Sequence, residues 1–275
     1  MSLPAEVLLG DWDPSPWLAA PLALAAGIYT AGWRGLRARM PERFPTWRLC
    51  AFLGGLAALF AATASPLDTL APKLLAVHMA QHLVLLMVAP PLLLLGSPAL
   101  PLLRGLPAGW IRASAASLFA WPPLRRLGEA LAHPLVGWSA MAAATWLWHL
   151  PAAFELALRV EAWHAIEHAS FLAAGTLFWW PVVQPWPSRP RWPRWAIVPY
   201  LLLADLQNTG LAALLTFSDR VLYPFYEAVP RLGGLSALDD QTAAGVLMWV
   251  PMSIAYLIPA CVITFRLLAP RAATR

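Results

Sequence analysis

The sequence predicts an all-α fold, a polytopic membrane protein whose 275 residues form a single domain, a bundle of seven transmembrane helices. Hydrophobic residues make up 60% of the chain and charged residues 12%, with a mean hydropathy of +0.60, values far from those of soluble domains. Sixteen tryptophans and twenty-eight prolines fit this class, because indole rings favour the headgroup region and membrane helices tolerate proline. Basic runs interleaved with aromatic residues are missing, so the pI near 9.8 does not indicate nucleic-acid binding.

Seven apolar segments are long enough to cross a bilayer, which takes about 20 mostly apolar residues. They cover approximately residues 16–34, 47–65, 74–95, 133–150, 162–182, 196–217 and 242–266. The third contains Pro90-Pro91, which we expect to kink or end that helix. Residues 1–16 lack the basic region of a secretory signal peptide, so we expect the first segment to stay in the mature protein.

The distribution of charge predicts the orientation of these segments. Of the 19 Lys and Arg residues, fifteen fall on one side, and only Lys73, Arg159, Arg220 and Arg231 fall on the other. By the positive-inside rule the fifteen face the cytoplasm, with the N-terminus outside and the C-terminus inside. Ten of the fourteen Asp and Glu residues fall on the outer side, which agrees with this orientation.

Two connections between the segments are long. Residues 99–132, on the inner side, are too short and too basic to span, and we expect an interfacial amphipathic helix there. Residues 218–241, on the outer side, are expected to fold back over the bundle as a lid.

Five of the six histidines are expected in one layer near the outer surface. Two pairs have the spacing i, i+4, which places both imidazoles on one helical face about 6 Å apart. Both pairs begin helices that run inward, and the fifth histidine ends a helix that runs outward to the same level. The five are His78, His82, His149, His164 and His168.

Such a layer of imidazoles predicts a metal or haem site. Polar groups at membrane depth are costly and are usually kept for a function, and imidazole commonly binds copper, zinc and haem iron. Four or five imidazoles without thiolate suit Cu(II), Zn(II) or a bis-His haem, whereas Cu(I) takes two or three. The chain lacks the H-E-x-x-H motif of a hydrolytic zinc site, and its two cysteines form no C-x-x-C motif.

Candidate supporting residues lie beside the two pairs. Glu161 precedes His164 by three residues on the same helical face, where a carboxylate can orient an imidazole. The alternative for Glu161 is a solvated acid that the helix dipole favours. Gln81 and Glu167 occupy equivalent places within the two pairs.

Acids and a thioether in the last two segments add further candidates. We expect Asp239 to cap the seventh helix, whereas Asp240 or Gln241 either caps that helix or reaches the metal. Met248 either packs in the core or offers a thioether to copper. For Asp205, near mid-bilayer in the sixth segment, three alternatives stay open: protonation, a bond to Asn208 or Thr209, or a place in a proton path.

Several motifs, in order along about residues 47–267, resemble the caa3-type CtaG family, seven-helix cytochrome c oxidase assembly proteins. These motifs are His78-Met79-Ala80-Gln81-His82 followed by Ala89-Pro90-Pro91, Trp148-His149-Leu150-Pro151, His164-Ala165-Ile166-Glu167-His168 with Phe178-Trp179-Trp180-Pro181, Leu222-Tyr223-Pro224, and Asp240-Gln241 with Gly245 and Trp249-Val250-Pro251.

The resemblance implies a factor of the bacterial plasma (inner) membrane that matures a haem-copper oxidase by handling copper at the outer face. Its partners would be the lipid bilayer, subunits of cytochrome c oxidase and an extracytoplasmic, or periplasmic, copper donor. We therefore expect a metallochaperone that binds Cu(I) or Cu(II) through the five histidines, not an enzyme, with redox activity left open. The alternatives are a haem-binding redox protein and a transporter of copper or protons.

Overall fold

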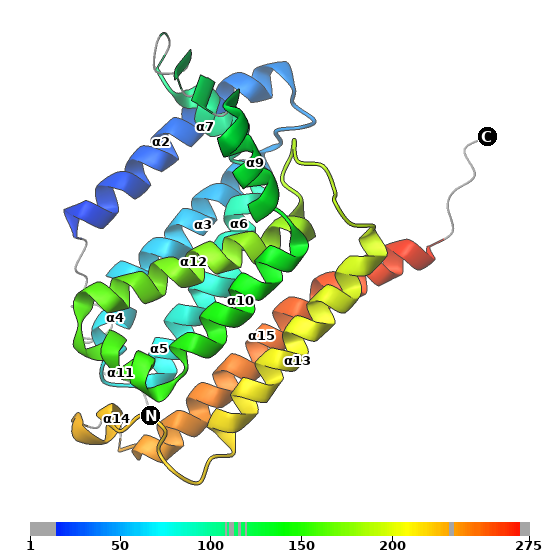
Figure 1. Ribbon diagram of the computed structural model, residues 1–275. Coiled ribbons are helices and arrows are strands. Elements are labelled where there is room, and N and C mark those ends of the chain that lie inside the picture. Colours follow the sequence, from blue (N-terminus) through cyan, green and yellow to red (C-terminus); the bar gives the residue numbers. More distant parts are fainter. Residues whose placement is uncertain are drawn as a thin grey trace.

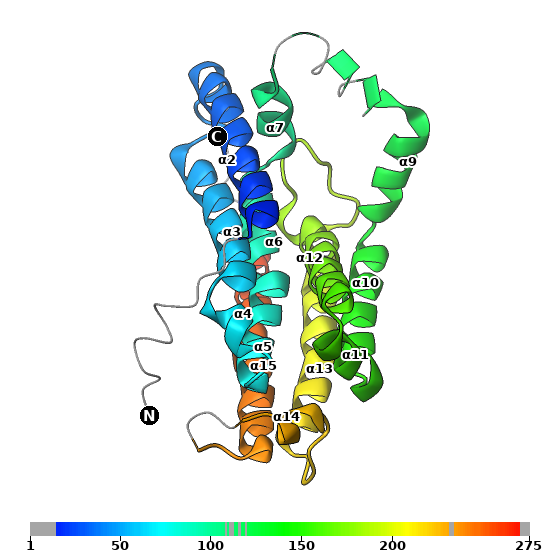
Figure 2. The same cartoon turned by 90° about the vertical axis from the view of Figure 1, so that its left-hand side faces the viewer.

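The computed structural model describes residues 15–107, 109, 113–114, 117–118, 120–230 and 234–269. These residues form helices and connecting turns and contain no β-strand, which confirms the all-α class. Figure 1 shows long helices side by side, with α4, α11 and α14 gathered at one end of the bundle and α7 and α9 at the other. Figure 2 shows the same two ends from the side.

Helices lie at all seven predicted segments. They are α2 (Pro16–Arg39), α3 (Thr46–Ala64), the continuous run of α5 (Leu75–Leu83), η1 (Val84–Val88) and α6 (Ala89–Leu95), α10 (Pro134–Trp148), α12 (Glu161–Val183), α13 (Ile197–Thr216) and α15 (Ala237–Leu268). The shorter helices are α4 (Pro66–Leu70), α7 (Ala99–Gly105), α9 (Pro122–Leu131), α11 (Pro151–Arg159), η2 (Arg194–Ala196) and α14 (Phe225–Ala228). Helices α2, α4, α9, α10 and α11 begin with proline. Proline lacks an N–H, and the first N–H of a helix has no partner within the helix, so proline is tolerated at this position.

Four helical stretches of the described chain are long and apolar enough to cross a membrane: Thr46–Leu70, Leu75–Leu95, Arg194–Thr216 and Ala237–Leu268. Leu206 and Phe265, on two of these stretches, are 67% and 75% exposed on the surface of the bundle, where lipid rather than water would cover them. The chain is thus a multi-pass membrane protein. The helices α2, α10 and α12 are not among the four stretches, so the count of seven spans and their orientation stay predictions.

The third segment continues past its prolines without ending. After His82 the α-helix passes into the π-helical turn η1 and continues as α6, which begins just before Pro90. Proline has no N–H, so the carbonyl of Leu86, four residues earlier, loses its helical donor. The indole Nε1 of Trp179 on α12 donates to that carbonyl at 2.9 Å. The carbonyl that Pro90 leaves without a donor therefore ties the third segment to α12.

Small residues let α12 lie close to its neighbours. A Cβ on Gly175 would come within 2.9 Å of the Pro90 Cγ and 3.0 Å of the Leu86 carbonyl oxygen. A Cβ on Gly137 of α10 would lie 2.5 Å from the Leu177 carbonyl oxygen of α12. Such close backbone approach is typical of packed membrane helices, and it fixes α12 between α10 and the third segment.

The described part of the loop predicted on the outer side, residues 218–230 and 234–236 and below called the outer loop, folds over the end of the bundle as predicted. Tyr223 and Tyr226 are both 1% exposed, and the backbone N–H of Phe225 donates to the Glu155 carboxylate at 3.2 Å. Gln241 holds the start of the loop, because its side chain accepts from Leu222 N at 2.7 Å. Gln241 therefore orders the loop rather than capping its own helix.

At the opposite end, the stretch 99–132 contains α7, which packs on α2, and α9, which contains no buried residue. Residues 108, 110–112, 115–116 and 119 of the predicted interfacial helix lie outside the described residues. Within α9, Leu127 and Leu131 are exposed beside an Arg125–Glu129 ion pair, a mixture suited to a membrane interface.

Candidate metal centre

The first turn of α5, which carries one histidine pair, is anchored by a residue from the far end of the chain. The Asp240 carboxylate on α15 accepts from Leu75 N at 2.8 Å and from Ala76 N at 3.0 Å. These N–H groups have no partner within α5, so Asp240 caps the neighbouring helix. Its own helix is capped by a capping box of Ser236 and Asp239, as expected for Asp239.

We expect Asp240→Ala to destabilise the protein by about 1–2 kcal/mol, because the first N–H groups of α5 lose their acceptor. The unfolding midpoint in detergent measures this loss. Asp239→Ala is the matched control: it removes an exposed capping contact on α15, should cost about 0.5–1 kcal/mol and should not disturb α5. Equal losses in both variants would contradict this role of Asp240.

Four side chains from α5 and α12 converge in one cluster. One ligand atom from each of His78, His82, Glu167 and His168 lies within 4.8 Å of the other three. Across the two helices the ring centroids of His82 and His168 are 5.7 Å apart. Three of these residues belong to the predicted ligands, and the fourth, Glu167, was predicted only as a supporting group.

Glu167 lies at the middle of this cluster and is completely buried. Its Oε2 is 3.5 Å from His78 Nε2 and its Oε1 is 3.6 Å from His82 Nε2, both longer than a normal hydrogen bond. Among the described residues neither carboxylate oxygen has a hydrogen-bond partner. A buried carboxylate without compensation costs several kcal/mol, so this position favours a cation.

Hydrogen bonds fix the orientation of His78. The Tyr226 hydroxyl donates to the Ala71 carbonyl at 2.9 Å and lies 3.2 Å from His78 Nδ1. Because the phenol oxygen is then an acceptor, we assign the proton of His78 to Nδ1, which leaves the Nε2 lone pair facing Glu167. Burial, with the carboxylates of Asp240 and Glu167, raises the pKa of Tyr226 well above its usual value, so the phenol stays protonated.

The remaining ligand atoms of the cluster are also unpartnered. His82 Nδ1, His82 Nε2 and His168 Nε2 are buried and have no hydrogen-bond partner among the residues that the structure describes. Buried polar groups in folded proteins are nearly always paired, so several orphans in one place need an explanation such as a bound ion. Imidazole nitrogens and one carboxylate form a donor set that suits copper or zinc.

His149 lies in the same layer but has a different neighbour. Its Nδ1 is 2.7 Å from the Thr145 carbonyl, and its Nε2 is 3.4 Å from the sulfur of Met79. Its ring centroid is 6.2 Å from that of His82. The sequence therefore placed His149 at the right level, but the thioether beside it belongs to Met79 of the His-x-x-Gln-His motif rather than to Met248.

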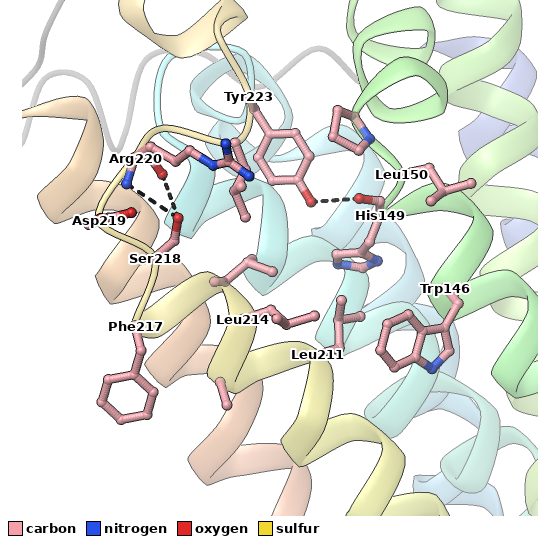
Figure 3. A pocket seen from close by; sticks show the side chains of 14 residues that line it. Trp146, His149, Leu150, Leu211, Leu214, Phe217, Ser218, Asp219, Arg220 and Tyr223 are labelled. Atoms are coloured by element: carbon pink, nitrogen blue, oxygen red, sulfur yellow. Dashed lines mark hydrogen bonds between the residues drawn. The ribbon is translucent and has the colours of Figure 1, made fainter.

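His149 also borders a pocket of about 760 Å³ between α10, α13 and the outer loop. Figure 3 shows the Tyr223 hydroxyl bonded to the His149 carbonyl, at 3.0 Å, with Leu211 and Leu214 on the opposite wall. The loop thus contacts both His78 and His149, through Tyr226 and Tyr223, and covers the histidine layer at this end of the bundle.

His164 forms a second group with a residue that the sequence did not indicate. Ligand atoms of Asp68, His164 and His168 lie within 4.8 Å of one another. Asp68 is on the short helix α4, in the turn before the third segment. Gln81 Nε2 donates to Asp68 Oδ1 at 3.0 Å and to the Ala62 carbonyl at 2.7 Å, so Gln81 orients the carboxylate.

The other candidates lie away from these groups. Glu161 is exposed in the first turn of α12, which fits its alternative as a solvated acid. Met248 is buried in α15, where its carbonyl accepts from Asn208 Nδ2. The Asp205 carboxylate accepts from Ser253 Oγ at 2.6 Å, a partner that the sequence did not suggest.

A family model described as cytochrome c oxidase caa3 assembly factor (Caa3_CtaG) matches residues 27–269. Uncharacterized proteins of Mycobacterium bovis and Mycobacterium tuberculosis are each 31% identical over 240 residues, and one of Mycobacterium leprae is 27% identical over 248. These matches cover 84% of this chain but only 35–36% of the relatives, so the chain spans about a third of their length. No solved structure shows a significant match.

Proposed function

The chain belongs to the family of cytochrome c oxidase caa3 assembly factors, as its motifs indicated, and from this premise we propose that it handles copper for a haem-copper oxidase. In this proposal copper is the cargo. The protein binds the ion through histidines in the outer half of the bundle, then holds it for the oxidase or delivers it.

The proposal includes a location and a topology. The protein would cross the bacterial plasma membrane seven times, with its N-terminus outside and its C-terminus in the cytoplasm, as the charge distribution indicates. The histidine layer, at the end of the bundle where α4, α11 and α14 gather, would then face an extracytoplasmic copper donor (Figure 1).

The observation that supports an ion most directly is the environment of Glu167. Two buried oxygens face two imidazole nitrogens at 3.5 and 3.6 Å, and on His78 that nitrogen carries a lone pair. Acceptors that face one another in a low-dielectric interior repel unless a positive charge lies between them. A single divalent or monovalent metal ion would supply that charge and could bind the Glu167 carboxylate together with one nitrogen from each of the three imidazoles.

The general order of metal affinities favours copper over zinc at this donor set. Imidazole and carboxylate sites bind Cu²⁺ more tightly than the other divalent ions of the first transition row, zinc included. A thioether beside the layer, at Met79, adds a soft donor of the kind that Cu(I) prefers. The residues around the cluster would orient and shield the ion: Tyr226 sets the His78 tautomer, Asp240 holds α5, and the outer loop excludes water.

The two alternatives have less support. A haem would have to place its macrocycle between imidazoles of α5 and α12. The ring centroids of His78 and His164 are 5.3 Å apart, and those of His82 and His168 are 5.7 Å apart. A compact cation fits between these rings and would also balance the charge of the buried Glu167 carboxylate. The transporter reading depended on a mid-bilayer acid, and Asp205 has a hydrogen-bond partner on α15 within the bundle.

Metal analysis of purified protein tests the proposal. We expect wild-type protein to retain copper after desalting, and His82→Ala and His168→Ala to lower its affinity at least ~10-fold. His133→Asn is the matched control, because His133 lies at the opposite end of α10, where its side chain accepts from Leu135 N as a helix cap. Substoichiometric copper that neither variant changes would contradict the proposal, and a Soret band lost in His82→Ala would favour haem.

A further inference from the structure

The histidine layer contains two overlapping groups of metal-binding side chains rather than one. The inner group is His78, His82, Glu167 and His168, and the outer group is Asp68, His164 and His168. Each group can bring its ligand atoms within 4.8 Å of one another, and His168 belongs to both. Among the described residues, these are the two groups in which three or more His, Cys, Asp or Glu side chains lie close enough to share a metal ion.

The two groups differ in their exposure. Asp68 and His164 are partly exposed, whereas His78 and Glu167 are completely buried and His82 is 3% exposed. His168, which joins the groups, is 9% exposed, more than the other three residues of the inner group. An ion that arrives from outside therefore meets the outer group first and reaches the inner group only past His168.

Two observations indicate that the outer group binds a ligand. His164 Nε2 is buried and has no hydrogen-bond partner in the described chain, as is also true of His168 Nε2. Asp68, in turn, is held in place by Gln81, the residue three positions after His78 in the inner motif. A carboxylate positioned beside two imidazoles, each of which offers a buried nitrogen without a hydrogen-bond partner, is a typical site for a divalent transition metal.

We propose that Asp68, His164 and His168 form a separate entry site for copper, from which the ion passes to the inner site through His168. This proposal rests on the copper function proposed above and adds a second site and a direction of loading. Because His168 belongs to both groups, an ion that moves between them stays within reach of one ligand throughout. The Asp68 carboxylate attracts cations at the exposed end of this path.

Copper titration and loading kinetics test this proposal on full-length protein in detergent. The probe is Cu(II) supplied from a chelating competitor, with bound copper measured by elemental analysis and loading followed by the absorbance of the released chelator. Wild-type protein is expected to bind one ion tightly and a second more weakly. Asp68→Asn, which keeps the acceptor for Gln81, and His164→Ala should lose the weak ion and load the tight one at least ~10-fold more slowly, at the scale typical of lost metal ligands.

Two comparisons separate this proposal from the one on which it rests. His82→Ala should lose the tight ion and keep the weak one, and His168→Ala should weaken both. If wild-type protein binds no copper, or if His82→Ala changes nothing, the copper function itself fails. Two results would contradict the entry site while the copper function stands. In the first, copper binds but Asp68→Asn and His164→Ala load the tight ion at the wild-type rate. In the second, these variants lose the tight ion to the same extent as His82→Ala.

Discussion

Glu167→Gln is expected to stabilise the metal-free protein and to lower its copper affinity at the same time. The substitution replaces a completely buried, unpartnered carboxylate by a neutral amide of similar size, which removes a desolvation cost of about 1–3 kcal/mol. It also removes the negative charge that faces His78 and His82, so copper binding should weaken at least ~10-fold. Thermal unfolding in detergent with a chelator measures the first effect, and copper titration measures the second.

Glu161→Gln is the matched control for this change. Glu161 lies on the same helix but is exposed in its first turn, where its charge contributes about 0.3–1 kcal/mol through the helix dipole. The control should therefore lose slight stability and keep its copper. If Glu167→Gln instead destabilises the metal-free protein and binds copper like the wild type, Glu167 is a structural partner of charged histidines and not a metal ligand.

Gly175→Ala is expected to destabilise the protein by about 1–3 kcal/mol and to weaken copper binding, although the residue contacts no ligand. The added methyl group would meet the Leu86 backbone and Pro90, so α12 must move away from the third segment. His164, Glu167 and His168 would move with α12 relative to His78 and His82. The unfolding midpoint and the copper affinity should therefore fall together.

Gly210→Ala provides the comparison, because this helical glycine of α13 has no atom within 4 Å of an added Cβ. Alanine there should stabilise the helix by about 0.5–1 kcal/mol and leave copper binding unchanged. If the two variants have the same unfolding midpoint and copper affinity, the close packing of α12 on the third segment does not matter for the site.

The sequence predicted those features that depend on local pattern. Runs of apolar residues predicted the positions of the long helices, and the i, i+4 spacing predicted that His78 and His82 share one face. The distribution of charged residues among the loops predicted that the histidines of different helices lie at one level in the bundle. Each of these inferences needs only helical geometry and the cost of burying charge.

The division of the layer could not be predicted in this way, because it depends on contacts between helices. Asp68 joins the site from the short helix α4, and no spacing rule relates it to His164. Glu161 shares a helical face with His164 but lies too near the start of α12 to be buried. Glu167 is adjacent in sequence to His168, and it lies inside because α12 is packed on two sides.

The bond from Asp240 to the first turn of α5 has a consequence for biogenesis. Asp240 follows Leu75 by 165 residues, and Tyr226 follows His78 by 148. While the ribosome is still making the middle of the chain, the helix with the first histidine pair lacks both its cap and the phenol that sets the His78 tautomer. The complete geometry of the histidine cluster therefore exists only after the last helix has been synthesised.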